Sequence, residues 1–387
     1  MRSADLAGNR KRLFCNPTWE IQIMAQQTEL DSSAVSQLPI NERIEWLLAR
    51  ERQFAASFQS SESFLARNLY HAKHPTAVLA LKCMDGRLNL ALATNTPVGI
   101  IQPFRSIGGR FDLGWPYFGE VMSVEIQQMT RQGRRTLILI NYHYSKGDLY
   151  RGCAGWNYDT ESARAGAYVL KRQLDEMFGT HHETVYPLVC GFETDDDALI
   201  LHGQNNEILD MSSLDSEDLA SMPAILSRLY PDMPHMIQED LLPILEGNFH
   251  HIEKLRRVTR TLDIVHHEWM IALGRGFSWL HMANQALIIG PWGPELAPPI
   301  HTAASIVQNN MKEKRIPDDG VVLFSVAPYY ELGIDRARAE QKARFLSRFG
   351  AEIIRTDFSE LSKKLHIRSA VLSWSTMQMD LLENGRA

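Results

Sequence analysis

The chain has 387 residues, of which 44% are hydrophobic and 22% charged, and its formal net charge is −6. These values are typical of a globular protein long enough for two domains, and they give no reason to expect nucleic acid as a partner, because duplex binders present a basic face. Four cysteines are too few for a disulfide framework, and no apolar run approaches the roughly 20 residues that a membrane span needs.

The first part of the chain divides into a polar stretch and a helical stretch. Residues 1–40 are polar and irregular, which predicts a weakly ordered lead-in. The basic start has no apolar run behind it, so we expect no signal peptide and a cytoplasmic protein. Over residues 41–74 apolar side chains recur at helical spacing, with Asn41 placed to cap the first turn. This pattern predicts one or two amphipathic helices that end before Pro75.

Short apolar runs alternate with longer amphipathic stretches over residues 75–183. The runs are typical of strands buried on both faces, and the stretches are long enough for crossover helices. This alternation predicts an α/β domain with a mostly parallel sheet. The predicted strands contain Ala77–Leu81, Val98–Ile101 and Thr136–Ile140, and the predicted helices lie within 114–133 and at Ala163–Phe178.

The same α/β pattern continues over residues 184–387, where we expect a second domain. Strands are predicted at Val185–Gly191, Ala198–His202, Gly320–Val326 and Ala351–Ile354. Helices are predicted at Pro223–Leu229, Leu255–Leu273, Ser278–Ile289 and Ile334–Phe349.

Two segments of the second domain resemble segments of the first. Leu137–Tyr144 is similar to Val322–Tyr329, with Pro328 where His143 stands. Leu79–Asp85 is similar to Pro187–Glu193. These echoes predict that the C-terminal domain is a degenerate duplicate without metal ligands.

Candidate metal ligands follow two of the predicted strands. Cys83 comes directly after the first strand, His143 directly after the third, and Cys153 ten residues further on. Because ligand sites in open parallel sheets lie at the carboxyl ends of strands, we expect these residues to meet. Two thiolates and one imidazole can bind Zn²⁺ and leave the fourth tetrahedral position open for water.

A carboxylate and a guanidinium lie two and four residues beyond Cys83. Asp85 is placed to accept a hydrogen bond from the metal-bound water, and Arg87 to keep that carboxylate ionised and off the metal. Zinc lowers the pKa of bound water to about 7, which makes it a nucleophile at physiological pH. The sequence therefore predicts a hydrating or hydrolytic zinc enzyme with Asp85 and Arg87 as catalytic residues.

These motifs resemble those of the β-class carbonic anhydrases, with Arg105-Ser-Ile-Gly-Gly109 between the first cysteine and the histidine. The spacing from His143 to Cys153 and the segment Arg151–Gly155 are similar to a divergent branch, the carboxysome shell carbonic anhydrases. The resemblance covers about residues 40–350. It implies an N-terminal helical domain, a catalytic zinc domain, and a related C-terminal α/β domain without metal.

The activity that the resemblance implies is reversible hydration of CO₂ to bicarbonate and a proton through zinc-bound hydroxide. Cys83, His143 and Cys153 would be the zinc ligands, and the subunits would form a homodimer or a higher homo-oligomer. The CO₂ pocket would lie near the Gly108–Gly109 turn, with Tyr142 or Tyr144 as a candidate wall.

Two features depart from the branch. It carries a long N-terminal extension that tethers the enzyme inside the carboxysome, whereas the lead-in here is short, so association with a shell or with Rubisco is not expected. The branch also has a histidine near the zinc, in a stretch that reads Gly274-Arg275-Gly276-Phe277 in this chain. An arginine, with a pKa above roughly 12, could not shuttle protons near pH 7 but could bind bicarbonate or another anion.

Two alternatives keep the metal and change the function. The same site could hydrolyse COS or CS₂. In the other alternative, Asp85 closes the fourth coordination position, and the protein is a zinc-stabilised scaffold or binding protein without turnover.

Other clusters have simpler explanations. Glu193 and Asp195–Asp197 could bind a hard cation, although an acidic turn that faces solvent is the favoured interpretation. The paired histidines at 181–182, 250–251 and 266–267 are expected at the surface or at interfaces, with a proton relay as the alternative. Cys190 is expected to be buried packing.

Overall fold

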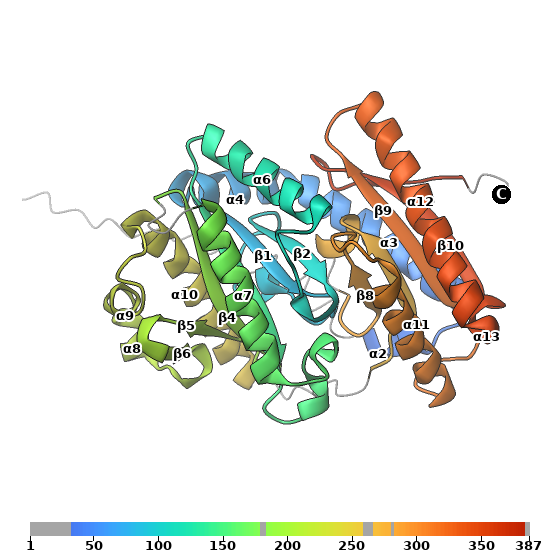
Figure 1. Ribbon diagram of the computed structural model, residues 1–387, viewed down its shortest axis with the longest axis horizontal. Coiled ribbons are helices and arrows are strands. Elements are labelled where there is room, and N and C mark those ends of the chain that lie inside the picture. Colours follow the sequence, from blue (N-terminus) through green and yellow to red (C-terminus); the bar gives the residue numbers. More distant parts are fainter. Residues whose placement is uncertain (1–31, 179–182, 258–265, 280–281, 384–387) are drawn as a thin grey trace, which may run out of the picture.

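The computed structural model describes residues 32–178, 183–257, 266–279 and 282–383. Two mostly parallel sheets lie side by side, and helices cover them (Figure 1). The α/β class predicted from the sequence is confirmed.

Within the described residues, three helices precede the first strand: α2 (Ser32–Ser36), α3 (Ile40–Gln59) and α4 (Ser61–Lys73). The prediction of one or two helices before Pro75 is confirmed by α3 and α4, although no residue of α4 is buried. The N-cap of α3 is Pro39, without a side-chain hydrogen bond, so the prediction that Asn41 caps this helix is wrong. Residues 1–31 of the expected lead-in lie outside the described part of the chain, and α2 occupies part of the remainder.

The first sheet has six strands in the order β2-β1-β3-β4-β5-β6. The first four strands pair in parallel, and β5 and β6 are added antiparallel. Every residue of β1 and β4 is buried, as expected for apolar runs covered on both faces. The bounds are Ala77–Cys83 for β1, Ile101–Ser106 for β2, Thr136–Tyr144 for β3, Val185–Glu193 for β4, Ala198–His202 for β5 and Ile208–Asp210 for β6.

Two features of this sheet bear on the predictions. The run Val98–Ile101 is mostly a turn that contains Gly99 at φ +100°, and β2 begins only at Ile101. The sheet includes β4, β5 and β6, which lie beyond residue 183, the expected end of the zinc domain. The domain limits themselves stay a prediction.

Crossover helices connect the parallel strands as predicted. Helix α6 (Pro116–Arg131) joins β2 to β3, and α7 (Thr160–Phe178) joins β3 to β4 and packs along both (Figure 1). Three short 3₁₀ turns shape the strand ends: η1 (Ile107–Gly109), η2 (Leu149–Arg151) and η3 (Ala154–Trp156). The remaining helices of this half are α5 (Leu90–Ala93), α8 (Ser216–Ala220), α9 (Met222–Leu229) and α10 (His235–Arg257).

The second sheet has five strands in the order β8-β7-β9-β10-β11, with only β11 antiparallel. Helices α11 and α12 are its crossovers (Figure 1). The strands are β7 (Met270–Gly274), β8 (Ala286–Ile289), β9 (Val321–Tyr329), β10 (Leu365–Ser373) and β11 (Met379–Leu381). The helical elements are η6 (Gly276–Trp279), α11 (Ala297–Lys312), α12 (Ile334–Asp357) and α13 (Ser359–Ser362).

Three predictions for this half are wrong. The predicted helix Leu255–Leu273 contains the end of α10 and most of β7, and the predicted helix Ser278–Ile289 ends in β8. The predicted strand Ala351–Ile354 is the last part of α12. Buried positions of α12, Ala343, Leu346, Gly350, Ala351 and Ile354 among them, recur at helical spacing, which decides the element.

The two sheets repeat one topology. The order β2-β1-β3-β4 of the first corresponds to β8-β7-β9-β10 of the second. Beyond these strands the first sheet adds the antiparallel β5 and β6, and the second adds the antiparallel β11. The echo between Leu137–Tyr144 and Val322–Tyr329 therefore pairs equivalent strands, β3 and β9. The second echo does not, because Pro187–Glu193 belongs to β4 of the first sheet.

The sheets meet at their edges. β2 ends the first sheet and β8 ends the second, and the two strands are in contact. The backbone N–H of Ile288 donates to the carbonyl oxygen of Met84, and that of Gly290 to the carbonyl oxygen of Arg105, each at 3.0 Å. No helix in the described part of the chain combines the length and apolarity needed to cross a bilayer.

Candidate metal centre

Cys83 is the last residue of β1, and Asp85 and Arg87 lie in the loop that follows it. The buried guanidinium of Arg105 on β2 donates hydrogen bonds to three carbonyl oxygens of this segment. The acceptors are Cys83, Asp85 and Leu88, at 3.3, 2.6 and 3.0 Å. One buried cation thus satisfies three backbone groups and fixes the loop. The sequence pointed to Arg105 only as part of a motif.

His143 lies on the opposite side of β3 from its tyrosine neighbours. Side chains alternate along a strand, so Tyr142 and Tyr144 share the other face, where their rings stack with centroids 6.2 Å apart. The Tyr142 hydroxyl and His202 Nε2 are hydrogen-bonded at 2.7 Å. The expectation that either tyrosine lines a pocket on the His143 side is therefore wrong.

Cys153 reaches the site from the segment between β3 and α7, which packs on a glycine turn. Trp156 Nε1 donates to the carbonyl oxygen of Gly108 at 2.8 Å. Gly108 and Gly109 have φ of +64° and +65°, and a Cβ on Gly109 would lie 2.8 Å from the carbonyl oxygen of Asn141. Glycine is therefore required here, and the turn lets the ends of β1 and β3 approach the Cys153 segment.

Cys83, His143 and Cys153 meet in the buried space between these segments. One ligand atom from each lies within 4.8 Å of the other two. Cys153 Sγ is 2.9 Å from His143 Nδ1, and Nε2 of the same ring is buried without a hydrogen-bond partner. Zinc bonds of about 2.0–2.3 Å at tetrahedral angles need ligand atoms roughly 3.3–3.8 Å apart, which is within this spread. The group could hold a metal ion, and it is the one such cluster among the described residues.

The two thiols differ in acidity. A hydrogen bond from Cys153 outweighs burial and holds the pKa of Cys83 well below its usual range. Burial, together with the hydrogen bond to Cys83, raises the pKa of Cys153. Of the two thiols, Cys83 is thus the more acidic, and a bound dication would supply the charge needed to deprotonate Cys153.

Asp85 and Arg87 form a buried ion pair beside the three candidate ligands. Asp85 accepts hydrogen bonds from the Arg87 backbone N–H at 2.8 Å, from Nε at 3.0 and 3.1 Å, and from a terminal nitrogen at 2.5 Å. Asp85 Oδ2 also lies 3.6 Å from His143 Nε2. Burial disfavours the charge of Asp85, but the Arg87 guanidinium prevails and holds the pKa of this carboxyl well below its usual range.

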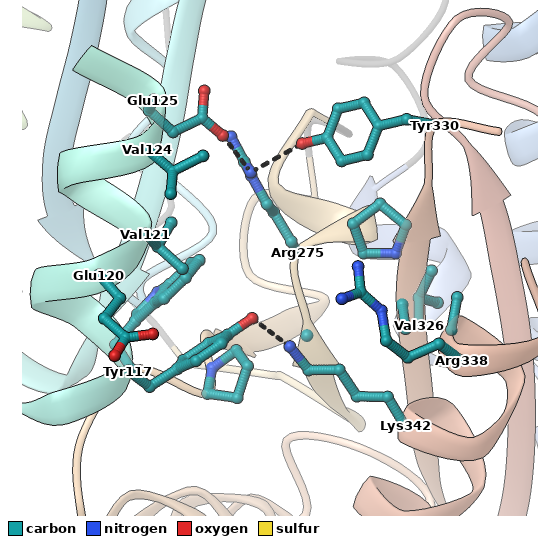
Figure 2. Close-up of a pocket in the computed structure, with 16 residues that line it drawn as sticks. Tyr117, Glu120, Val121, Val124, Glu125, Arg275, Val326, Tyr330, Arg338 and Lys342 are labelled. Atoms are coloured by element: carbon teal, nitrogen blue, oxygen red, sulfur yellow. Dashed lines mark hydrogen bonds and ion pairs between the residues drawn. The ribbon is translucent and has the colours of Figure 1, made fainter. Parts of the chain in front are cut away.

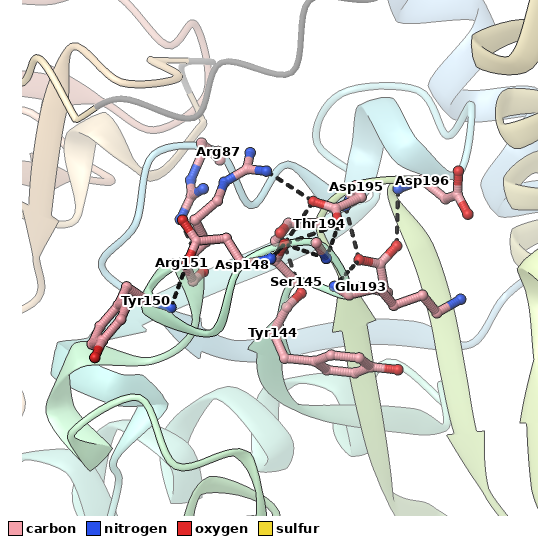
Figure 3. Close-up of polar contacts among 12 residues, drawn as sticks. Arg87, Tyr144, Ser145, Asp148, Tyr150, Arg151, Glu193, Thr194, Asp195 and Asp196 are labelled. Carbon is pink, nitrogen blue, oxygen red and sulfur yellow. Dashed lines mark hydrogen bonds and ion pairs between the residues drawn. The ribbon is translucent and has the colours of Figure 1, made fainter.

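The sequence favoured an acidic turn facing solvent after β4, but several of these carboxylates bind the neighbouring loop. Asp195 accepts hydrogen bonds from Ser145 Oγ at 2.8 and 2.9 Å, from the Gly147 backbone N–H at 2.8 Å and from Arg151 at 2.9 Å (Figure 3). Glu193 is fully buried. These carboxylates hold the loop between His143 and Cys153. The sequence missed this role because the donors lie about 50 residues away.

A histidine–glutamate pair from the second half lies near the ion pair. His266 Nδ1 is 2.9 Å from Glu268 Oε1, and Glu268 is buried. The charge of Glu268 raises the pKa of His266, and Asp85 adds to this effect. The sequence missed Glu268 because a helix was predicted over it. The feature of the sequence that could have indicated this pair is the run His266-His-Glu268, which ends two residues before β7.

The other histidine pairs have ordinary surroundings. His250 is mostly exposed and lies 3.6 Å from Glu253, and His251 Nε2 lies 3.1 Å from Asp197. His181 and His182 lie outside the described residues. Cys190 is a fully buried free thiol, as expected of packing.

Arg275 does not lie near the candidate ligands. It follows β7, whereas Glu268 precedes β7, and a strand rises about 3.3 Å per residue, so the two stand roughly 20 Å apart. Its guanidinium pairs with Glu125 of α6 at 2.7 Å. The interpretation that Arg275 takes the place of a histidine beside the zinc is therefore wrong.

No protein-family model matches the chain, and no curated protein matches it. Among solved structures, the β-carbonic anhydrase CcaA is similar at 14% sequence identity and a TM-score of 0.32, over 44% of this chain and 92% of that one. A likeness this distant does not assign a function, so the functional argument depends on the geometry of the site.

Proposed function

We propose that the protein is a zinc-dependent carbonic anhydrase, which hydrates CO₂ reversibly to bicarbonate and a proton. The observation that carries this proposal is the meeting of two thiols and an imidazole beside an ionised carboxylate, with Asp85 Oδ2 3.6 Å from His143 Nε2. Two sulfurs and one nitrogen are ligands that zinc prefers, and three protein ligands are typical of catalytic sites.

The metal's contribution would be Lewis acidity, which lowers the pKa of a water molecule to about 7. The residues of the chain supply orientation. Asp85 is ionised, so it can only accept hydrogen bonds. A group bound to the metal beside it must therefore have a proton to donate. Arg87 occupies both carboxylate oxygens and holds Asp85 in place.

The same contacts favour an enzyme over a zinc-stabilised scaffold. In a scaffold, Asp85 would have to close the fourth position, but the hydrogen bonds from Arg87 oppose its movement toward the metal. His266 has 29% of its side chain exposed and interacts electrostatically with Asp85. It is the titratable group best placed to carry a proton to solvent.

Metal analysis and stopped-flow CO₂ hydration, followed with a pH indicator, test the proposal. The wild-type protein should hold one zinc per chain and be active. Cys83→Ser should lose both zinc and activity because it removes a thiolate ligand. Asp85→Asn should keep the metal and lose activity by about 10- to 100-fold. Cys190→Ser, the matched control, should keep both, since this thiol lies outside the site.

Each alternative gives its own result. A protein that holds one zinc per chain but shows no hydration between about pH 7 and 9 would contradict the enzyme and support the scaffold. Turnover of COS or CS₂ without turnover of CO₂ would support the same metal site with a different substrate.

A further inference from the structure

The second sheet has a place equivalent to the metal centre. Val78 pairs with Leu137 in the first sheet, and Met270 pairs with Val322 in the second. If the two pairs are superposed, Arg275 takes the position of Cys83, each five residues beyond its reference residue. By the same count, Pro328 takes the position of His143.

A cavity of about 530 Å³ lies at this equivalent place, between α6 and α12 (Figure 2). Both Arg275 and Pro328 line it. Its size is that of a site for a small organic molecule. The second half thus has Arg275 and Pro328 at the positions that correspond to Cys83 and His143. It keeps an open space at the carboxyl ends of β7 and β9, where parallel sheets bind ligands.

Each half completes the site of the other. Glu268 of the second half stands near Asp85 at the metal centre. At the cavity, Glu125 of the first half neutralises Arg275, whose guanidinium also lies 4.8 Å from the Phe104 ring and 4.3 Å from the Trp374 ring. The floor of the cavity is therefore an ion pair, although Arg275 Nε is buried without a hydrogen-bond partner.

The wall formed by α12 carries two further cations. Arg338 is 80% exposed and pairs with Asp335 at 2.9 Å. Lys342 has its Nζ 4.2 Å from the centroid of the Tyr117 ring and bonds to the Tyr117 hydroxyl, which carries no charge (Figure 2). Three cations and two carboxylates, Glu120 and Glu125, line the cavity. Glu125 neutralises Arg275 and Asp335 pairs with Arg338, whereas Lys342 bonds to a neutral hydroxyl and is the lining cation best able to attract an anion.

The opposite wall combines aromatic and apolar side chains with the carboxylates Glu120 and Glu125 of α6 (Figure 2). The Tyr117 ring stacks on Trp292, with centroids 5.8 Å apart and planes inclined by 13°. Val121 and Val124 continue this wall along α6. Such a surface binds a flat or apolar body rather than a fully hydrated ion.

We propose that this cavity binds a small organic anion, with an apolar body against Tyr117 and Trp292 and an oxyanion group on Lys342 and Arg338. The oxyanion can be a carboxylate or a phosphate, because both accept charge-assisted hydrogen bonds from these side chains. This site is separate from the metal centre, and its ligand binds whether or not the protein hydrates CO₂.

Isothermal titration calorimetry on the full chain tests the proposal with four probes: benzoate, phenyl phosphate, inorganic phosphate and benzyl alcohol. We expect benzoate or phenyl phosphate to bind, and the tighter of the two identifies the oxyanion. Inorganic phosphate and benzyl alcohol should bind more weakly, since each lacks one half of the proposed ligand. Lys342→Gln should weaken binding about tenfold, which equals about 1.4 kcal/mol.

Two further variants separate this site from the metal centre, which could also attract anions. Val124→Trp should block binding by filling the cavity from an exposed position of α6. Arg348→Gln, the same loss of charge on an exposed position of α12 outside the cavity, should leave binding unchanged. Failure of both aromatic anions to bind at about 10 mM, or binding unaltered in Lys342→Gln and Val124→Trp, would overturn the proposal. Equally tight binding of inorganic phosphate would contradict the apolar wall.

Discussion

His202 lies against Tyr142 with 8% of its surface exposed, and burial lowers the pKa of its imidazole to about 4. In the unfolded chain a histidine titrates near pH 6.5. Between these two values the unfolded state binds a proton that the folded state does not bind, so stability falls as the pH falls.

We therefore predict that acidification from pH 7 to pH 5 costs the wild-type protein roughly 2 kcal/mol through His202. In His202→Gln, this contribution to the loss of stability between pH 7 and pH 5 should be absent. Urea denaturation of both proteins at the two pH values measures it, with His250→Gln, a largely exposed histidine, as the control. Parallel losses in wild type and His202→Gln would show that His202 does not cause the acid sensitivity.

Residue type and position predicted the candidate ligands but not their supports. Cys83, His143 and Cys153 could be found because few residue types bind zinc and because strand ends gather ligand sites. Asp195 and Glu268 could not be assigned, since a carboxylate in a sequence does not reveal which distant donors it meets. Their roles depend on contacts with segments far along the chain.

At the scale of elements, the β4–β5 turn clamps the loop that carries Cys153. Asp195 Oδ1 and Oδ2 bind two side chains and one backbone N–H of that loop. Without this clamp the loop would sample more conformations, and metal binding would have to order it again.

Asp195→Asn should therefore lower metal affinity by about tenfold, as measured by competition with a chromophoric chelator. The matched control is Asp196→Asn, one residue along, whose side chain is 36% exposed. Equal affinities in the two variants would mean that the clamp does not support the metal centre.

Elements with a continuous apolar run or a clear period could be predicted, and those with mixed signals could not. β1, β3, α7 and the start of α12 follow their sequence patterns closely. Ala351–Ile354 reads as a strand in isolation but continues the buried face of α12. β8 was taken for a helix because its four residues, Ala286–Ile289, are too short to show a period.

At the scale of the whole molecule, only one of the two similar segment pairs found in the sequence matches equivalent strands of the two sheets. Leu137–Tyr144 and Val322–Tyr329 match because both are central strands buried in the same way. Elsewhere the two halves share the order of their strands but not the amino-acid sequence of those strands. Sequence comparison within the chain could not find this shared order for that reason.

Metal removal should destabilise the whole molecule in one transition. The main hydrophobic core contains residues of both sheets, so the two halves should unfold together. Zinc at about 1,000 times its Kd would add roughly 4 kcal/mol. Differential scanning calorimetry should show a single peak that moves down by a few degrees when a chelator is added. Two peaks, with only one of them sensitive to the chelator, would contradict this prediction.

The contact between β2 and β8 has a consequence for how the chain can be divided. An uncovered outer strand offers its N–H and C=O groups to any other chain that can add a strand. In this protein each half covers the edge strand of the other, β2 in the first sheet and β8 in the second. A half produced alone would expose this edge strand to solvent, so such fragments would tend to aggregate.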